Sequence, residues 1–399
     1  LSPRENFMKI KMNEGFKRLK GNYVFADIRK KIAEKEGENL IDLSVGDAAY
    51  PIAKVVGEAM KNAADEMSGE NFKGYPPASG YPFLKTAIKN YYIHRGVEVS
   101  EDEVFVSDGA KSDIKRIVEL FGDLTVTIFA PGYPPQYDCA ALNNKKIEII
   151  DLSKDLFIPN VNRLSEKPRL IFLCSPSNPC GTVISKAVLK GFVDYALKTS
   201  SVIVYDSAYA DYIGKDCLKS GGVFCPYEVD GAKKCVIEIR SLSKFASFTG
   251  IRCGWSVVPG ELVTGGMKVS DFYMRKLSSE FNGVGYIVQR GAEAALSIEG
   301  EEYSKNIIKI YLDNAFSLAK LLKTRGVKFF GGENSPYVFF EKPFSWGKTA
   351  AFEYLFNKFG IAVTPGEGFV AFGKDYARIS CLKKREEFYK ALSILKDAF

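Results

Sequence analysis

The sequence predicts an α/β fold: a seven-stranded, mostly parallel sheet covered by helices on both faces, joined by a smaller α/β domain. Seven short runs rich in β-branched and aromatic residues alternate with helical stretches between about residues 100 and 260. Parallel strands are buried on both faces and therefore read as near-continuous apolar runs. After about residue 290 the pattern changes to long amphipathic helices with few strands, which indicates the second domain.

The elements follow in order. Residues 1–45 are polar and helical and end in a short apolar strand at 39–45, which Gly46 and Asp47 stop. A helix near 53–67 leads to a loop rich in glycine and proline at 73–82, which we expect to be an ordered turn. The seven strands of the large sheet are expected at residues 104–106, 126–129, 147–150, 170–173, 202–205, 236–239 and 255–258.

The change in pattern also predicts the domain boundaries. We expect a large domain over residues 46–288, and a smaller one formed by residues 289–399 together with residues 1–45 as an N-terminal arm. Ligands of an open α/β sheet bind beyond the carboxyl ends of its strands. Polar motifs follow directly after several of the seven runs, so we expect the functional site at that edge of the large domain.

Composition excludes several classes of protein. The net charge of +7 comes from lysines spread along 399 residues, and no finger, basic zipper or helix-turn-helix pattern indicates nucleic-acid binding. No run approaches the roughly 18 apolar residues of a membrane span. The eight cysteines form no C-x-x-C pair, which favours a reduced cytoplasmic protein without a disulfide frame or metal site. His94, the single histidine, is expected on a helix surface.

The segment from residue 241 to 255 is the most informative. Lys244 lies between serines, with Ser241 and Ser243 before it and Arg252 eight residues after it. A lysine amine can bind an aldehyde covalently, while hydroxyl and guanidinium groups can hold a phosphate. Pyridoxal 5′-phosphate (PLP) carries both groups, so the segment predicts a PLP site. The pattern S-x-S-K alone also fits a plain surface loop.

Other strand ends carry complementary groups. The turn at 107–111 opens a helix and can present backbone N–H groups to an anion. Tyr133 lies between prolines and can stack on a planar ring, and Asn178 is held by two prolines. Asp206 ends an apolar strand and needs a cationic partner, such as a protonated pyridine nitrogen. Plain turns, core packing or a structural ion pair explain each motif singly, whereas their succession favours one cofactor site.

As a set, these motifs resemble the class I/II aminotransferases of PLP fold type I over nearly the whole chain. The resemblance implies that Lys244 binds the cofactor and moves the substrate α-proton, and that Asp206 pairs with the pyridine nitrogen. It further implies that Tyr209 and Asn178 contact the phenolic oxygen and that Tyr133 stacks on the ring. The phosphate would be held by Gly109, Ala110, Lys111, Ser241, Ser243 and Arg252.

The resemblance also bears on substrate and assembly. Arg378, in Ala-Arg-Ile-Ser, matches the family arginine that binds the substrate α-carboxylate bidentately. Enzymes of this family build each active site at the interface of a homodimer. Tyr75, at the cofactor, and Asn282, at the substrate, match positions contributed by the partner subunit.

Within the family the sequence is most similar to the LL-diaminopimelate aminotransferases of lysine biosynthesis, in the stretches 22–27, 43–47, 281–283 and 331–337. This similarity implies that Tyr23, Gly46 and Lys111 line the substrate pocket together with Asn178. The chain departs from that group at Ala78, where the group carries an acid suited to the distal ammonium of diaminopimelate. Without that acid a buried ammonium would lose about 1.5–3 kcal/mol of charge-assisted bonding.

The expected activity is therefore transfer of an amino group from an amino acid to a 2-oxo acid, with glutamate and 2-oxoglutarate as one pair. Two alternatives stay open: an aminotransferase for another aromatic or aliphatic amino acid, and a PLP-dependent carbon–sulfur lyase. A transcription regulator built on the same fold ranks lowest, because the region before Gly46 is too short for a DNA-binding domain.

Overall fold

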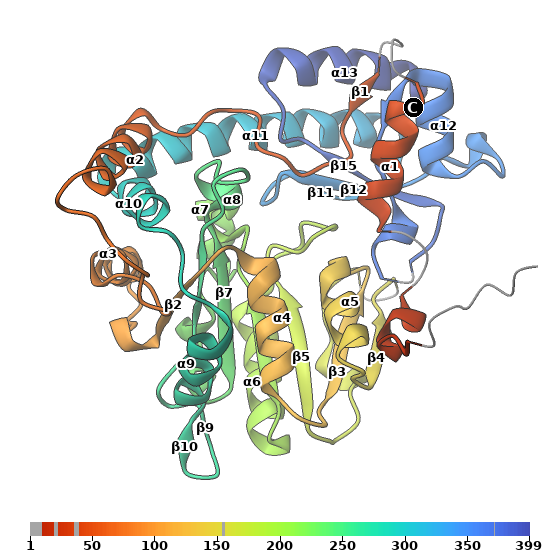
Figure 1. Cartoon of the computed structure of the whole chain (residues 1–399). Helices are drawn as coiled ribbons and strands as arrows, with labels where there is room; N and C mark the ends of the chain where they lie inside the picture. Colours follow the sequence, from red (N-terminus) through yellow and green to blue (C-terminus); the bar gives the residue numbers. More distant parts are fainter. Residues whose placement is uncertain (1–9, 20–22, 36–39, 154–155, 371) are drawn as a thin grey trace, which may run out of the picture.

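The computed structural model describes residues 10–19, 23–35, 40–153, 156–370 and 372–399. Its largest sheet has seven strands in the order β2-β8-β7-β6-β5-β3-β4 (Figure 1). β8 runs antiparallel to β2 and β7, and all other neighbours are parallel. Each predicted run forms one strand, which confirms the predicted fold class: β2 (Val104–Ser107), β3 (Thr125–Ala130), β4 (Ile147–Asp151), β5 (Arg169–Cys174), β6 (Val202–Asp206), β7 (Val236–Ser241) and β8 (Gly254–Val257).

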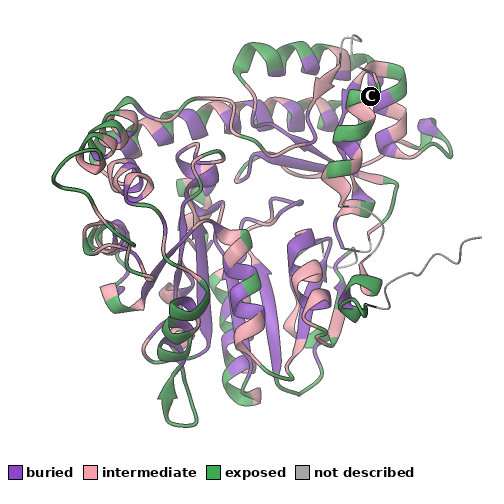
Figure 2. Ribbon diagram, viewed as in Figure 1, coloured by how far each residue is buried: buried purple, intermediate pink, exposed green. Residues whose placement is uncertain are grey.

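Alternate side chains of the central strands pack into two separate cores, one on each face of this sheet. On β5, Ile171 and Leu173 join one core and Leu170 and Phe172 join the other. The first core includes α6, and the second includes α4, α5 and α9. The bounds of these helices are α4 Ala110–Leu120, α5 Pro134–Leu142, α6 Lys186–Thr199 and α9 Val269–Glu280. Figure 2 shows the central strands of the large sheet as buried and the outer sides of the helices as exposed.

A second, antiparallel sheet has the order β11-β12-β15-β14 and packs with long C-terminal helices. N-terminal residues join this part of the fold, because β1 pairs in parallel with β13. The strands are β1 Ile41–Asp42, β11 Phe329–Gly331, β12 Tyr337–Glu341, β13 Ile361–Ala362, β14 Thr364–Pro365 and β15 Tyr376–Ser380, and the helices are α1 Val24–Ala33, α11 Ile298–Thr324, α12 Ala351–Phe359 and α13 Arg385–Ala398.

The remaining elements complete the framework. The predicted helix near 53–67 is α2, which packs against α10 and α11, and α10 in turn packs against α3 (Figure 1). The remaining helices are α2 Lys54–Met67, α3 Pro82–Ile93, α7 Lys215–Lys219, α8 Leu242–Phe245 and α10 Tyr286–Ala295. Two short strands, β9 (Val263–Thr264) and β10 (Met267–Lys268), form a hairpin. The strand expected at 39–45 is confined to Ile41–Asp42 among the described residues. The domain boundaries at 45/46 and 288/289 stay a prediction.

A helix that spans a membrane must be both long and apolar, and no helix in the described ranges meets both conditions.

Candidate active site

A cavity of about 520 Å³ lies at the carboxyl ends of the central strands. Eleven of the predicted site residues line it: Gly46, Ala110, Lys111, Tyr133, Asn178, Asp206, Tyr209, Ser241, Ser243, Lys244 and Arg252. They come from β6, β7, the starts of α4 and α8, and the turns after β1, β3, β5 and α8. The polar motifs that follow successive strands therefore converge on one cavity, as expected for an open α/β sheet.

Lys244 lies in the short helix α8, which continues directly from β7. Its Nζ donates a hydrogen bond to the backbone carbonyl of Gly46. Burial lowers the pKa of Lys244 to about 8; Arg378 and Arg252 act in the same direction and Asp47 opposes them. A larger fraction of the side chain is therefore the neutral amine near neutral pH, which is the form that attacks a carbonyl carbon.

The start of α4 and the segment after Lys244 form a compact set of anion donors. Gly109, the residue before α4, has a φ of 125°, and a Cβ there would collide with Nη2 of Arg252. Nη1 of Arg252 donates to Oγ of Ser243 at 3.0 Å, and the Ser243 N–H donates to Oγ of Ser241 at 3.2 Å. Free N–H groups, two hydroxyls and a guanidinium are the donors that a phosphate requires. A cradle that admits only glycine fits this use.

Asp206 ends β6 with its side chain in the cavity and is 3% exposed. Burial raises the pKa of its carboxyl group to about 6, although the Ala208 N–H donates to Oδ1 at 3.0 Å. Among the described residues no lysine or arginine forms an ion pair with this carboxylate. A buried carboxylate needs a cationic partner, so the environment of Asp206 fits a protonated pyridine nitrogen.

Arg378, on β15, is 1% exposed. It donates from Nη1 to Oδ1 of Asn178 at 2.7 Å, and from Nη2 to the Ser44 carbonyl at 2.6 Å and to Oγ1 of Thr364 at 3.1 Å. Its Nε has no hydrogen-bond partner in the described part of the chain. Asn178 and Arg378 are therefore adjacent, and the guanidinium retains a donor for a carboxylate.

Aromatic side chains enclose this region. The hydroxyl groups of Tyr209 and Tyr337 are 2.9 Å apart, and the Arg378 guanidinium lies 4.1 Å from the centre of the Tyr337 ring. Burial raises the pKa of Tyr209 well above its usual value. A Cβ on Gly46 would collide with the Tyr337 hydroxyl, so any other residue here would displace Tyr337. Tyr23 accepts a hydrogen bond from Nζ of Lys111 at 3.2 Å and is thereby tied to the cavity.

Five predicted site residues are absent from the cavity lining. Gly109, Tyr23 and Arg378 lie beside residues that do line it, whereas Tyr75 and Asn282 lie at the surface. Tyr75 is 87% exposed, and Asn282 is also exposed. Their segments nevertheless touch, because a Cβ on Gly283 would reach the Pro77 carbonyl at 2.5 Å. Both residues therefore belong to one surface of this chain, where the sequence predicts contact with a partner subunit.

Several residues that complete the site were not predicted from the sequence. Tyr337 was part of a recognised stretch, and Ser44 and Asp47 flank Gly46, so their positions offered a signal. Arg29 follows the stretch 22–27 by two residues and so lay near a signal, whereas Thr364 offered none, because it comes from a segment distant from every recognised motif. The added residues are Tyr337, Ser44 and Thr364 around Arg378, and Arg29, Asp47, Cys174 and Thr249 in the cavity lining.

Comparison with known proteins identifies the family. The sequence model described as aminotransferase class I and II matches residues 38–395. LL-diaminopimelate aminotransferases from Azobacteroides pseudotrichonymphae and Agathobacter rectalis are 36% and 37% identical over 400 and 407 residues, covering 97% of this chain and 98% and 99% of theirs. The structure of L,L-diaminopimelate aminotransferase from Chlamydomonas reinhardtii superposes with a TM-score of 0.90 at 32% identity, covering 98% of this chain and 99% of that one. The chain therefore belongs to the class I and II aminotransferases, which use pyridoxal 5′-phosphate as their cofactor.

Proposed function

We propose that this aminotransferase exchanges an amino group between an amino acid and 2-oxoglutarate, with Arg378 binding the α-carboxylate of each substrate. The observation that carries this proposal is the environment of Arg378. Its guanidinium is buried beside Asn178 and near Lys244, and no described carboxylate pairs with it. Leaving a buried guanidinium unpaired costs free energy, so a carboxylate ligand is favoured there.

We assign the cofactor contacts by the chemistry of each group. Lys244 would bind the aldehyde, Asp206 the pyridine nitrogen, Asn178 and Tyr209 the phenolic oxygen, and Tyr133 the ring face. The α4 N-terminus, Ser241, Ser243 and Arg252 would hold the phosphate. When bound, PLP supplies an aldehyde that takes up the amino group and a ring that accepts electrons from the α-carbon.

The chain's own groups then control the proton. Nζ of Lys244, with its pKa of about 8, would take the proton from the substrate α-carbon and deliver it to the carbon that carries the aldehyde of bound PLP. The Asp206 carboxylate would accept a hydrogen bond from the protonated pyridine nitrogen and so stabilise the proton there. Arg378 fixes the α-carbon near Lys244, so that this proton faces Nζ. The aromatic enclosure formed by Tyr209 and Tyr337 excludes water from this position.

Charges in the cavity bear on the substrate side chain. Arg29 and Lys111 line it, and Asp47 and Asp206 are the carboxylates in the lining. With Asp206, Lys244 and Arg252 assigned to the cofactor, Asp47 is the remaining carboxylate among the described lining residues. It stands against the two remaining cations, Arg29 and Lys111, which favours the distal carboxylate of glutamate or 2-oxoglutarate. Ala78 packs against an apolar cluster and supplies no acid.

LL-diaminopimelate is a second candidate substrate. It is favoured because the relatives that are 36–37% identical to this chain are LL-diaminopimelate aminotransferases. This substrate would place the enzyme in lysine biosynthesis. Asp47 is the cavity carboxylate that could meet its distal ammonium in place of an acid at position 78.

We further propose a homodimer with shared active sites. Exposed Tyr75 and Asn282 lie on adjoining segments, as expected if this surface closes the partner's cavity. Mixing inactive Lys244→Ala chains with inactive Tyr75→Ala chains tests this, because a mixed dimer would contain one intact site. Recovery of about a quarter of the activity is expected by statistical assortment, and no recovery after subunit exchange would argue against shared sites.

A half-reaction screen tests the proposed function. The PLP-loaded protein is mixed with single amino acids, and conversion of the lysine-bound cofactor to pyridoxamine phosphate is followed by absorbance. Conversion with glutamate is expected. Conversion with LL-diaminopimelate as well would show that Asp47 or another group replaces the acid missing at position 78. Release of ammonia and pyruvate without a 2-oxo acid acceptor would instead identify a lyase.

A further inference from the structure

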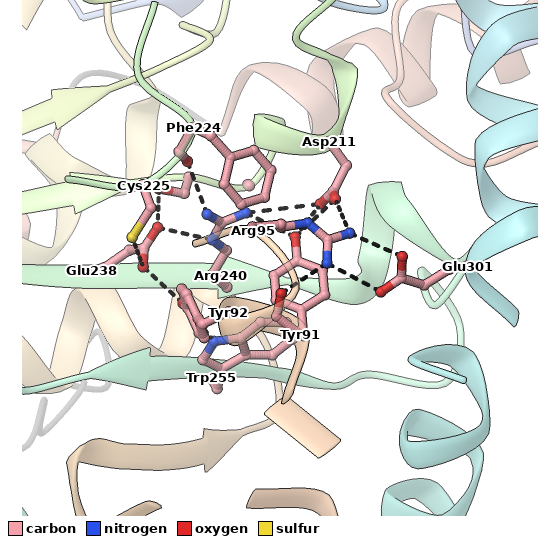
Figure 3. Close-up of polar contacts among 12 residues, drawn as sticks. Tyr91, Tyr92, Arg95, Asp211, Phe224, Cys225, Glu238, Arg240, Trp255 and Glu301 are labelled. Atoms are coloured by element: carbon pink, nitrogen blue, oxygen red, sulfur yellow. Dashed lines mark hydrogen bonds and ion pairs between the residues drawn. The ribbon is translucent and has the colours of Figure 1, made fainter. Parts of the chain in front are cut away.

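A buried polar network links residues of β7, α3 and the short 3-10 helix that contains Asp211 (Figure 3). Its centre is Arg240 on β7, whose side chain is 2% exposed, next to Glu238 on the same strand, which is fully buried. All three nitrogen groups of Arg240 are used: Nε donates to Glu238 at 2.8 Å, Nη1 to the Tyr91 hydroxyl at 3.0 Å and Nη2 to the Phe224 carbonyl at 2.9 Å. The guanidinium therefore has one defined orientation.

One arm of the network reaches the residue after Asp206. Oε1 of Glu238, which accepts from Arg240, also accepts from Oγ of Ser207 at 2.6 Å. The Ser207 N–H donates to the carbonyl of Ile239 at 2.9 Å. Side chain and backbone of Ser207 are thus both bound to β7, which fixes the peptide that carries Asp206.

The other arm reaches the segment beyond Tyr209. The Tyr91 hydroxyl accepts from Arg240 and donates to the Asp211 carboxylate at 2.8 Å. Asp211 lies in the short 3-10 helix η4 (Ala210–Tyr212), directly after Tyr209. In the same helix the Tyr212 hydroxyl donates to the backbone carbonyl of Lys244 at 2.9 Å.

Arg240 therefore holds both ends of the segment 207–211 and precedes Ser241 and Lys244 on a continuous strand and helix. We propose that Arg240 is a positioning residue that fixes Asp206 and Tyr209 relative to Lys244. The proposal rests on the roles assigned to those three residues above, and it adds a group that touches neither cofactor nor substrate.

Charge balance supports a role in geometry rather than in stability. Burial alone would lower the pKa of Arg240, but Glu238, Tyr91, Tyr92 and Asp211 raise it well above the usual value, so the guanidinium stays charged. Desolvation of buried charges offsets most of their mutual attraction, and apolar replacements are often equally stable. A fully bonded network of this kind instead selects one arrangement of the groups that it connects.

The chain offers a matched pair of variants. Tyr91 and Tyr92 are neighbours in α3 and are 2% and 0% exposed. Tyr91→Phe removes the hydrogen bonds that join Arg240 to Asp211 and leaves only their longer ion pair at 3.9 Å. Tyr92→Phe removes an equally buried hydroxyl that donates to Oε2 of Glu238 at 2.7 Å and accepts from Trp255 at 3.0 Å, with no hydrogen bond to the segment 207–211. Ser207→Ala breaks the arm to Glu238 with minimal loss of volume.

The purified protein is used with PLP bound, in whichever oligomeric state it adopts. Two quantities are measured in addition to the melting temperature. One is the pH midpoint of the visible absorbance of the bound cofactor, and the other is kcat against KM with the best amino acid of the screen. Tyr91→Phe and Ser207→Ala should shift the midpoint and lower kcat about ten-fold or more with KM unchanged, as expected for misplaced reacting groups. Tyr92→Phe should leave both at the wild-type values.

Equal effects of all three variants, or no shift in any, would overturn the proposal and leave the network a purely structural feature. If Tyr91→Phe does not fold, Ser207→Ala against Tyr92→Phe decides by the same criteria. An inactive wild-type protein would refute the proposed function separately, because the absorbance midpoint requires only bound PLP.

Discussion

Nη1 of Arg378 donates a hydrogen bond to Oδ1 of Asn178 at 2.7 Å, joining residues 200 positions apart in the sequence. Arg378 lies on β15 of the four-stranded sheet, and Asn178 lies in the turn that follows β5 of the seven-stranded sheet. The proposed site for the substrate carboxylate and the proposed contact to the cofactor ring are therefore one connected unit. A substrate that binds Arg378 acts on the position of Asn178.

Arg378→Lys tests the carboxylate site. Lysine keeps the charge but lacks the planar pair of donors, and it leaves Asn178 without its partner. We expect kcat/KM in the half-reaction to fall about 100-fold, within the range of about 2–5 kcal/mol for disrupting a buried charged contact. Arg385→Lys, at a half-exposed arginine that pairs with Asp313, is the control and should be silent. Similar kinetics for both variants would contradict the assignment.

Asp206→Asn should stabilise the cofactor-free protein. Because burial raises the pKa of Asp206 from 3.8 to about 6, the native state binds this proton more tightly than the unfolded state. Wild-type stability therefore contains a contribution that is complete below pH 3.8 and lost as the pH rises through about 6. Above pH 6 the variant should be more stable by about 3 kcal/mol, the value of a shift of about two pKa units. Chemical denaturation at pH 4 and pH 7 measures this, and an equal difference at both pH values would contradict it.

With PLP bound, the same substitution should have the opposite effect on function. Asparagine cannot supply the charge that keeps a proton at the pyridine nitrogen. Loss of a buried charge pair of about 3–4 kcal/mol predicts a fall in kcat of about 100- to 1000-fold. Single-turnover kinetics with glutamate measure it, and wild-type turnover would remove Asp206 from the site.

The rate of PLP binding to the cofactor-free protein should depend on Lys244. The neutral amine is the reactive form, and the pKa of this group is lowered to about 8. The observed rate should therefore rise with pH through a midpoint near 8. Stopped-flow absorbance measures it, and a midpoint near 10.5, the ordinary value for lysine, would show that Lys244 is not the reacting group.

Gly109→Ala tests the phosphate cradle. The added methyl group would collide with Arg252 and would strain a backbone with φ of 125°. Displacing Arg252 removes a charge-assisted bond to phosphate, so the dissociation constant for PLP should rise about ten- to 100-fold. Gly122→Ala, where a methyl group has no neighbour within 4 Å, is the control. Equal PLP affinity for the two variants would place the phosphate elsewhere.

The fold was predictable because each buried strand of the sheet corresponds to a short apolar stretch of sequence. Every run rich in β-branched residues between 100 and 260 became a strand, and the helices between parallel strands bring the strand ends to one edge. For the same reason Lys244, Asp206 and Asn178, each at or just after the end of its strand, could be expected in one cavity.

The rest depends on contacts between distant elements. The approach of Tyr337 to Tyr209, of Thr364 to Arg378 and of Tyr91 to Arg240 is fixed only when the sheets and helices pack together. No local pattern encodes these distances. Tyr75 and Asn282 are a different case, since their predicted role requires a second subunit.

The central claim is that Lys244 binds PLP in this cavity. It is tested most directly by reducing the PLP-loaded protein with borohydride, digesting it and locating the phosphopyridoxyl group by mass spectrometry. We predict a single labelled peptide with the modification on Lys244 and none in Lys244→Ala. Modification of another lysine, or a label that persists in Lys244→Ala, would contradict the assignment of the site.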